Sequence, residues 1–180
     1  MSKLSGELLK VFVYGTLKRG EPNHHWLTRS ENGYAHFVGE GTTVEKFPLV
    51  VGTRYNIPFL LDKRGCGHHI MGEIYEVDKA MFANLDVLED YPVYYDREIQ
   101  SIAMKNECVV EREKDLFKNY FNSDFFLFRI VPCWLYLIRK FPEKLLEKEH
   151  LSSYHNTKVK PYRERSERDI NIKAIDDLSY

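Results

Sequence analysis

The chain has 180 residues and a mass of 21.4 kDa, with 43% hydrophobic and 14% aromatic residues. This is enough for one good core but marginal for two domains of typical size, so we expect one domain. A total of 26 Lys and Arg against 27 Asp and Glu gives a formal net charge of -1, and no basic block stands out. These values exclude a long acidic disordered protein and do not indicate a nucleic-acid surface.

Three cysteines are widely spaced and form no C-x-x-C pair: Cys66, Cys108 and Cys133. They suggest neither a disulfide framework nor a structural zinc site. The first ten residues contain no apolar stretch of the kind found in signal peptides. The longest apolar run, Phe125 to Ile138, is interrupted by Arg129 and Pro132 and is too short to span a bilayer. We therefore expect a cytoplasmic protein without a membrane segment.

Five segments are rich in β-branched or aromatic residues, and Gly, Pro or Asn lies near most of their ends, which predicts strands. They are Val11 to Tyr14, Ala35 to Thr43, His69 to Val77, Tyr94 to Met104 and Cys133 to Ile138. The apolar segment Asn56 to Leu61 contains Pro58, so we expect a loop or an edge segment there. Most connections are too short for helical crossovers, which favours an α+β fold with a small, mainly antiparallel β-barrel.

One segment is clearly helical. Lys79 to Leu88 contains good helix formers without Gly or Pro, and Asp78 can cap its first turn. On a helix that advances roughly 100° per residue, Met81, Phe82, Leu85 and Leu88 form one apolar face, and Glu89 projects between Phe82 and Leu85.

The composition divides the chain into a domain and its extensions. Residues 1–10 form an N-terminal extension, and 11–151 form the domain. Within the domain, 110–131 is expected to be an insertion, since it combines a run of charges with many aromatic residues. The polar residues 152–180 are expected to form a mobile C-terminal tail.

The first candidate binding site is the segment Tyr14-Gly15-Thr16-Leu17, where the opening strand ends. A glycine here lets successive backbone N–H groups turn inward and hold an anion, such as a carboxylate or a phosphate. Glu21 and Pro22 stand where a nucleotide-binding loop requires Lys and Ser or Thr, which argues against that class. An ordinary strand-ending turn is the alternative.

Glu89 is the second candidate. Burial and the negative end of the helix dipole both disfavour a charged carboxylate here, so its pKa is expected to be raised, as a general base at neutral pH requires. Alternatively, the helix ends earlier and the side chain turns to solvent, or Arg97 neutralises it. The adjacent pairs His24-His25 and His68-His69 point in different directions and do not indicate a metal site.

These segments together resemble the γ-glutamylamine cyclotransferases of the γ-glutamyl cyclotransferase-like superfamily. The resemblance rests on segments that occur in the same order: V-F-V-Y-G-T-L-K-R-G from Val11 with P-N-H from Pro22, F-P-L-V from Phe47, N-I-P-F-L-L from Asn56, G-E-I-Y from Gly72, and L-D-V-L-E from Leu85 followed by Pro92, Tyr95 and Arg97. A weaker match surrounds Ser153-Tyr154 and Pro161-Tyr162-Arg163. The first ten residues and Val110 to Val131 do not match the family pattern.

The resemblance implies a β-barrel with flanking helices that binds a γ-glutamyl group through Tyr14, Gly15, Thr16 and Leu17. Glu89 would then accept a proton from the substrate amine, which attacks the γ-carbonyl and yields 5-oxoproline and a free amine. A γ-glutamylamine such as γ-glutamyl-ε-lysine is the implied substrate, and no metal or organic cofactor is implied. We also expect a monomer.

Two alternatives stay open: a cyclotransferase for other γ-glutamyl compounds, or a non-catalytic γ-glutamyl-binding module. Asp90 follows Glu89 where many relatives carry a small residue. We expect it to be tolerated, because adjacent helix positions point in different directions.

Overall fold

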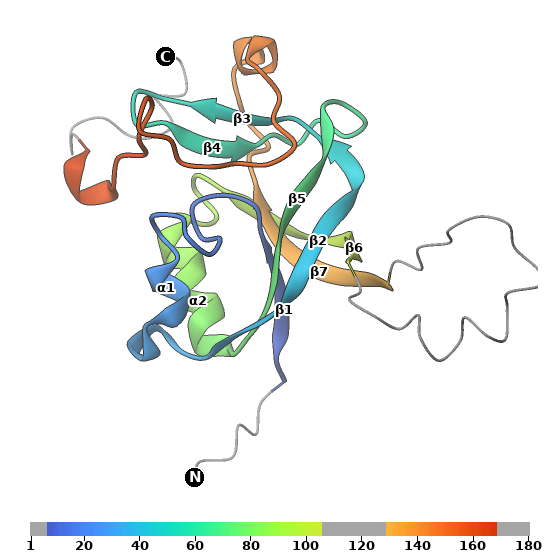
Figure 1. Cartoon of the computed structure of the whole chain (residues 1–180), viewed down its shortest axis with the longest axis vertical. Helices are drawn as coiled ribbons and strands as arrows, with labels where there is room; N and C mark the ends of the chain where they lie inside the picture. Colours follow the sequence, from blue (N-terminus) through green and yellow to red (C-terminus); the bar gives the residue numbers. More distant parts are fainter. Residues whose placement is uncertain (1–6, 106–128, 169–180) are drawn as a thin grey trace, which may run out of the picture.

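The computed structural model describes residues 7–105 and 129–168 of the chain (Figure 1). Within these ranges, five strands close into a barrel in the order β1, β5, β2, β6, β7, and β3 and β4 form a separate two-stranded sheet. The strands are β1 (Leu9–Val13), β2 (Ala35–Phe47), β3 (Leu49–Gly52), β4 (Ile57–Leu60), β5 (His68–Val77), β6 (Asp96–Met104) and β7 (Arg129–Leu137). The helices are α1 (His25–Thr28), α2 (Lys79–Leu88) and the short 3-10 helices η1 (Ser30–Asn32), η2 (Glu143–Glu147) and η3 (Arg165–Glu167).

The barrel is mainly antiparallel, as the short connections predict. Every neighbouring pair of barrel strands runs antiparallel except β1 and β7, which run parallel and pair Val11 with Trp134. This confirms the predicted α+β fold with a small barrel and flanking helices. Figure 1 shows both α-helices on one side of β1, outside the barrel.

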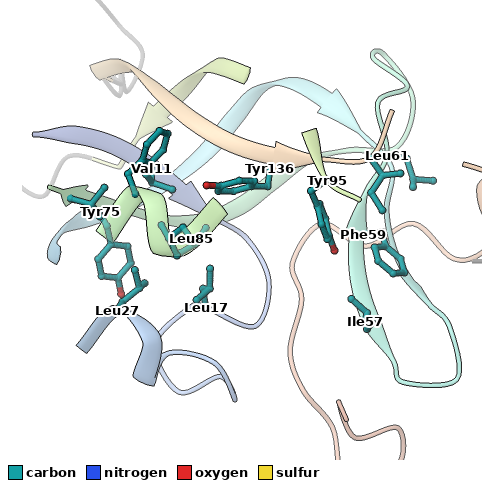
Figure 2. Close-up of a cluster of buried hydrophobic side chains, with 14 of the residues drawn as sticks. Val11, Leu17, Leu27, Ile57, Phe59, Leu61, Tyr75, Leu85, Tyr95 and Tyr136 are labelled. Atoms are coloured by element: carbon teal, nitrogen blue, oxygen red, sulfur yellow. The ribbon is translucent and has the colours of Figure 1, made fainter. Parts of the chain in front are cut away.

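The last three residues of strand β1, Val11 to Val13, are buried on both faces, which explains the apolar run V-F-V. Phe12 packs inside the barrel with Ile74 and Leu135, whereas Val11 and Val13 belong to a second cluster that includes residues of α2. Successive side chains of a strand point to opposite faces, so a strand with buried residues on both faces has to be covered on both. Helix α2 supplies the outer cover (Figure 2).

Helix α2 begins and ends as the sequence predicts. The Asp78 carboxylate accepts a hydrogen bond of 2.8 Å from the Met81 N–H, which satisfies one of the unpaired donors of the first turn. Met81, Phe82 and Leu85 are buried, and the last helical residue is Leu88. The orientation of this helix fixes where its C-terminal residues lie.

The two-stranded sheet was only partly predicted. Residues Asn56 to Leu61 contain strand β4 rather than a loop, and its partner β3 was not predicted. In a two-stranded sheet each strand has an edge without a ladder partner, where the missing N–H of Pro58 is tolerated. The edge alternative was therefore the correct one.

All five barrel strands differ from their predicted bounds by one to four residues at one or both ends. β1 begins at Leu9, inside the predicted N-terminal extension, and β2 continues past Thr43 to Phe47. β7 begins at Arg129, so the last three residues of the predicted insertion 110–131 belong to the barrel. The other residues of that insertion lie outside the described residues. α1 was not predicted, because four residues carry too little periodicity.

The expectation of a mobile tail from residue 152 onward is wrong for its first part. Tyr154 is only 2% exposed and belongs to the same buried cluster as Phe12 and Leu49. The Lys18 Nζ donates to the Tyr154 carbonyl at 2.6 Å, and the Asn56 side chain donates to the Pro161 carbonyl at 2.9 Å. Single anchoring contacts, rather than a continuous apolar face, hold this segment on the domain. Its sequence therefore contains few apolar residues, and its composition did not indicate that it is anchored.

Replacing Tyr154 by Ala is expected to lower the free energy of unfolding by about 3 kcal/mol, since it removes a large ring from the core. Urea unfolding measures the loss. Tyr154→Phe keeps the ring and serves as the control, because the structure uses the Tyr154 carbonyl, and not its hydroxyl, to accept from Lys18. Equal stability of Tyr154→Ala and the unchanged protein would contradict the packing described above.

Candidate active site

A cavity of about 110 Å³ lies where the end of β1, the β3–β4 sheet, the end of α2 and the C-terminal segment meet. It is lined by Phe12, Val13, Tyr14, Gly15, Thr16, Leu17, Asn23, Ile57, Pro58, Leu88, Glu89, Asp90, Tyr94, Tyr95, Tyr136, Tyr162 and Arg168. Both predicted candidates, the loop after β1 and Glu89, therefore line the same cavity. Six of the 17 lining residues are aromatic, and the charged groups of the cavity are two carboxylates and one guanidinium.

The loop after β1 is held at both ends. The Tyr14 hydroxyl donates to the Tyr136 carbonyl at 2.8 Å, and the Lys18 N–H donates to the Gly15 carbonyl at 3.2 Å. Among the hydrogen bonds of the described residues, none uses the N–H groups of Gly15, Thr16 or Leu17 as donors. Three consecutive backbone donors are thus available at the cavity wall, which is what an anion or an oxyanion requires.

Glycine is needed at position 15 because the chain passes very close to β4. A β-carbon added to Gly15 would lie 2.9 Å from the Cγ of Pro58, closer than real β-carbons approach other atoms. The loop and the β3–β4 sheet therefore meet at Gly15, and a side chain there would separate them.

Glu89 occupies the C-terminal end of α2. Its N–H donates to the Leu85 carbonyl at 2.9 Å, so the helical hydrogen bonding continues up to this residue. The side chain is partly buried and lines the cavity. The alternative in which the helix ends early and Glu89 turns to solvent does not describe this arrangement.

The charge of the Glu89 carboxylate affects the pKa of three tyrosines that line the cavity. Burial raises the pKa of Tyr14 and Tyr95 well above the ordinary value, and the nearby charge of Glu89 raises both further. Burial also raises the pKa of Tyr136, together with its hydrogen bond of 2.7 Å to Asp86. These hydroxyls stay protonated at neutral pH, and each donates its proton to another protein group, so the tyrosines near Glu89 are neutral.

Arg97 was the predicted alternative partner of Glu89. Its Nε lies 3.1 Å from the Asp86 carboxylate, and its guanidinium lies 4.2 Å from the centre of the Phe82 ring. Arg97 thus pairs with Asp86, one turn before Glu89, on the side of α2 that faces β6 and β7. This pair also positions Tyr136, whose hydroxyl donates to the same carboxylate oxygen.

Asp90 differs from its expected position. The helix has ended before it, and the residue adopts a φ of 53°, in the left-handed region. The rule that adjacent helix positions diverge therefore does not apply, and Asp90 lines the same cavity as Glu89. The sequence contained a sign of this turn, since Pro92 follows two residues later.

Asn23, Tyr162 and Arg168 line the cavity but were not among the predicted site residues. The Asn23 side chain donates to the Thr16 hydroxyl and to the Tyr162 hydroxyl, each at 3.0 Å. It connects the loop after β1 with the C-terminal segment. The weak family match around Pro161-Tyr162-Arg163 was the signal that could have identified this wall.

The histidines do not converge on one point. His24 bonds to the Leu17 carbonyl at 3.1 Å and His25 to the Pro22 carbonyl at 3.0 Å. Within residues 7–105 and 129–168, no group of three or more His, Cys, Asp or Glu residues is arranged to hold a metal ion. In the same residues, no helix has the length and apolar character needed to cross a bilayer.

The raised pKa values of the buried tyrosines predict a loss of stability at alkaline pH. Above about pH 10 the unfolded chain releases tyrosine protons that the native state retains, so the free energy of unfolding falls as pH rises. Urea unfolding between about pH 9 and about pH 11 measures the slope. Tyr14→Phe is expected to reduce the slope, and Tyr34→Phe, which removes an exposed hydroxyl, is the control. An unchanged slope in Tyr14→Phe would contradict a buried, protonated Tyr14.

Comparisons with known proteins agree with this architecture. The sequence profile described as "Gamma-glutamyl cyclotransferase, AIG2-like" matches residues 11–156. A Drosophila melanogaster protein named "Putative gamma-glutamylcyclotransferase CG2811" is 57% identical over 171 residues, which cover 95% of this chain and 94% of the relative. The gamma-glutamylaminecyclotransferase of Homo sapiens is 35% identical over 144 residues, covering 80% of this chain and 88% of the relative.

A solved structure supports the same assignment. The crystal structure of an AIG2-like protein (A2LD1, GGACT) from Mus musculus superimposes with a TM-score of 0.75 at 35% identity, covering 90% of this chain and 99% of the other. The predicted resemblance is thereby confirmed at the level of the family. This chain belongs to the γ-glutamyl cyclotransferase, AIG2-like family.

Proposed function

We propose that the protein is a γ-glutamylamine cyclotransferase that converts γ-glutamyl-ε-lysine to 5-oxoproline and lysine. The observation that carries the proposal is the meeting of one carboxylate, Glu89, and three unused backbone donors, those of Gly15, Thr16 and Leu17, in a single small cavity. An enzyme that accepts a proton from one substrate atom and stabilises negative charge on another needs both kinds of group.

In the proposed first step, Glu89 accepts a proton from the α-ammonium group of the γ-glutamyl unit. The freed amine attacks the γ-carbonyl carbon of the same unit, and a five-membered ring closes. Protonated Glu89 gives this proton to the leaving nitrogen and then takes a second one from the ring nitrogen. The C–N bond to the leaving amine breaks as the carbonyl re-forms, and Glu89 passes the second proton to the released amine. The substrate atoms are conserved in the two products, so no water is consumed and no metal or organic cofactor is required.

The backbone donors of the loop would stabilise the charge that develops on the γ-carbonyl oxygen or bind the α-carboxylate of the substrate. Backbone N–H groups suit this role because they are fixed before the reaction begins and need not reorganise. The Gly15–Pro58 approach and the Tyr14–Tyr136 hydrogen bond hold the loop rigidly.

The size of the cavity supports an intramolecular reaction. Because nucleophile and electrophile belong to one molecule, the protein mainly has to hold a cyclising conformer, and such orientation can lower the barrier by about 7–11 kcal/mol. A compact space of about 110 Å³ with aromatic walls restricts the conformers of the bound glutamyl unit.

The amine-specific assignment draws on two observations. The segment Asn56-Ile57-Pro58 belongs to the resemblance to the γ-glutamylamine cyclotransferases, and it supplies both the residue that approaches Gly15 and part of the cavity wall. The human relative, 88% of whose length is covered by the match, is named gamma-glutamylaminecyclotransferase. We also propose that the protein acts as a monomer.

Glu89→Gln is expected to lower kcat by at least about a hundredfold, since an amide cannot accept the α-ammonium proton. Purified protein is incubated with γ-glutamyl-ε-lysine, and 5-oxoproline and free lysine are quantified by mass spectrometry. Glu149→Gln is the matched control, because Glu149 is exposed and lies outside the cavity. Thermal unfolding of both variants shows whether they fold.

Substantial turnover by a folded Glu89→Gln variant would remove Glu89 as the base. Faster turnover of γ-glutamyl amino acids or glutathione than of the lysine isopeptide would overturn the amine-specific assignment. Binding of 5-oxoproline without release of any amine would identify a binding module instead of an enzyme.

A further inference from the structure

The C-terminal segment places a guanidinium group at the cavity wall. Arg168 lines the cavity and is partly buried. Its Nη2 donates to the Tyr162 hydroxyl at 2.7 Å and its Nε donates to the Arg163 carbonyl at 3.2 Å. The guanidinium carbon also lies 5.6 Å from the centre of the Tyr55 ring. The group is therefore fixed by two hydrogen bonds and an aromatic neighbour, rather than extended into solvent.

A chain of side chains links this arginine to the loop after β1. The Tyr162 hydroxyl accepts from Arg168 and also from Asn23, and Asn23 donates to the Thr16 hydroxyl. The Arg163 N–H donates to the Tyr55 carbonyl at 3.0 Å, which anchors the segment on the turn between β3 and β4. Figure 1 shows the segment beside that turn. These hydrogen bonds hold Arg168 in a fixed position relative to the loop after β1, which is proposed to bind the glutamyl unit.

The guanidinium retains donors for a ligand. Arginine carries five N–H donors, and the two hydrogen bonds use two of them, which leaves three. No carboxylate in residues 7–105 and 129–168 forms an ion pair with Arg168, whereas Arg19, Arg64, Arg97 and Arg139 each do so. The planar fork of a guanidinium matches a carboxylate, to which it can donate two parallel hydrogen bonds.

We propose that Arg168 binds the carboxylate of the departing amine and so selects substrates whose amine is an amino acid. This inference rests on the proposed function. In that function, Glu89 and the loop donors serve the ammonium, carboxylate and carbonyl groups of the glutamyl unit. Arg168 is the remaining charged donor of the cavity wall, and lysine released through its ε-amine carries a carboxylate at its other end.

Two substrates that differ by one carboxylate test the proposal. γ-Glutamyl-ε-lysine carries it, and the γ-glutamyl amide of 1,5-diaminopentane lacks it but keeps both the methylene chain and the distal ammonium group. Arg168→Gln is expected to raise KM for the lysine substrate about tenfold, with KM for the diaminopentane substrate and kcat for both nearly unchanged. Arg168→Lys, which keeps the charge, is expected to recover part of the loss.

Arg163→Gln is the matched control, because it removes an exposed guanidinium from the same segment, outside the cavity. It is expected to leave both KM values unchanged. An equal rise of KM for the two substrates in Arg168→Gln would overturn the proposal, since it would mean that Arg168 acts on the glutamyl unit or only on the fold. No change for either substrate would overturn it as well.

Binding measurements separate this inference from the proposed function. Calorimetry with the Glu89→Gln protein compares the Kd values of the two ligands without turnover. The Glu89→Gln protein is expected to bind the lysine compound more tightly than the diaminopentane compound, and the double variant Glu89→Gln, Arg168→Gln is expected to lose this difference. That result supports the carboxylate subsite even where the unchanged protein releases no product. Equal Kd values for the two ligands would overturn the subsite, whereas absence of products from the unchanged protein would overturn the proposed function alone.

Discussion

The close approach of Gly15 to Pro58 is the constraint on which the cavity depends. The loop after β1 and strand β4 are separate in sequence and belong to different sheets, and they meet at a position where a β-carbon would be only 2.9 Å from the proline ring. Tyr95 strengthens the junction, because its hydroxyl donates to the Pro58 carbonyl at 3.2 Å. Figure 2 shows Tyr95 between Tyr136 and the β4 residues Ile57 and Phe59. If this junction opened, the loop donors would lose their fixed position.

The aromatic walls determine the electrostatics of the site. Tyr14, Tyr95 and Tyr136 are buried, and each has a protein acceptor for its hydroxyl, so the space around Glu89 contains neutral groups with settled hydrogen bonds. A carboxylate interacts more strongly with substrate charge in such surroundings than in water. The raised pKa of Glu89 that the sequence predicts stays a prediction, while its charge contributes to the raised pKa of each of the three tyrosines.

The sequence was informative where one local pattern sufficed. The V-F-V run predicted the first barrel strand, and Asp78 with the apolar face of Lys79–Leu88 predicted the helix that precedes Glu89. The same reasoning could not reach contacts that depend on distant residues. Lys18 to Tyr154 and Asn23 to Tyr162 join residues more than 130 positions apart, and the polar composition of the C-terminal segment conceals its anchors. Asp90 was misplaced because its left-handed backbone ends the helical geometry on which the prediction relied.

The most direct test of the account follows the oxygen of the solvent. The protein is incubated with γ-glutamyl-ε-lysine in water enriched in ¹⁸O, and the glutamyl product is analysed by mass spectrometry. Cyclisation by the substrate's own amine predicts 5-oxoproline without incorporated ¹⁸O, in an amount equal to the lysine released. Glutamate that carries ¹⁸O would show that water is the nucleophile and would contradict the central claim that the cavity holds a γ-glutamyl unit for attack by its own α-amine.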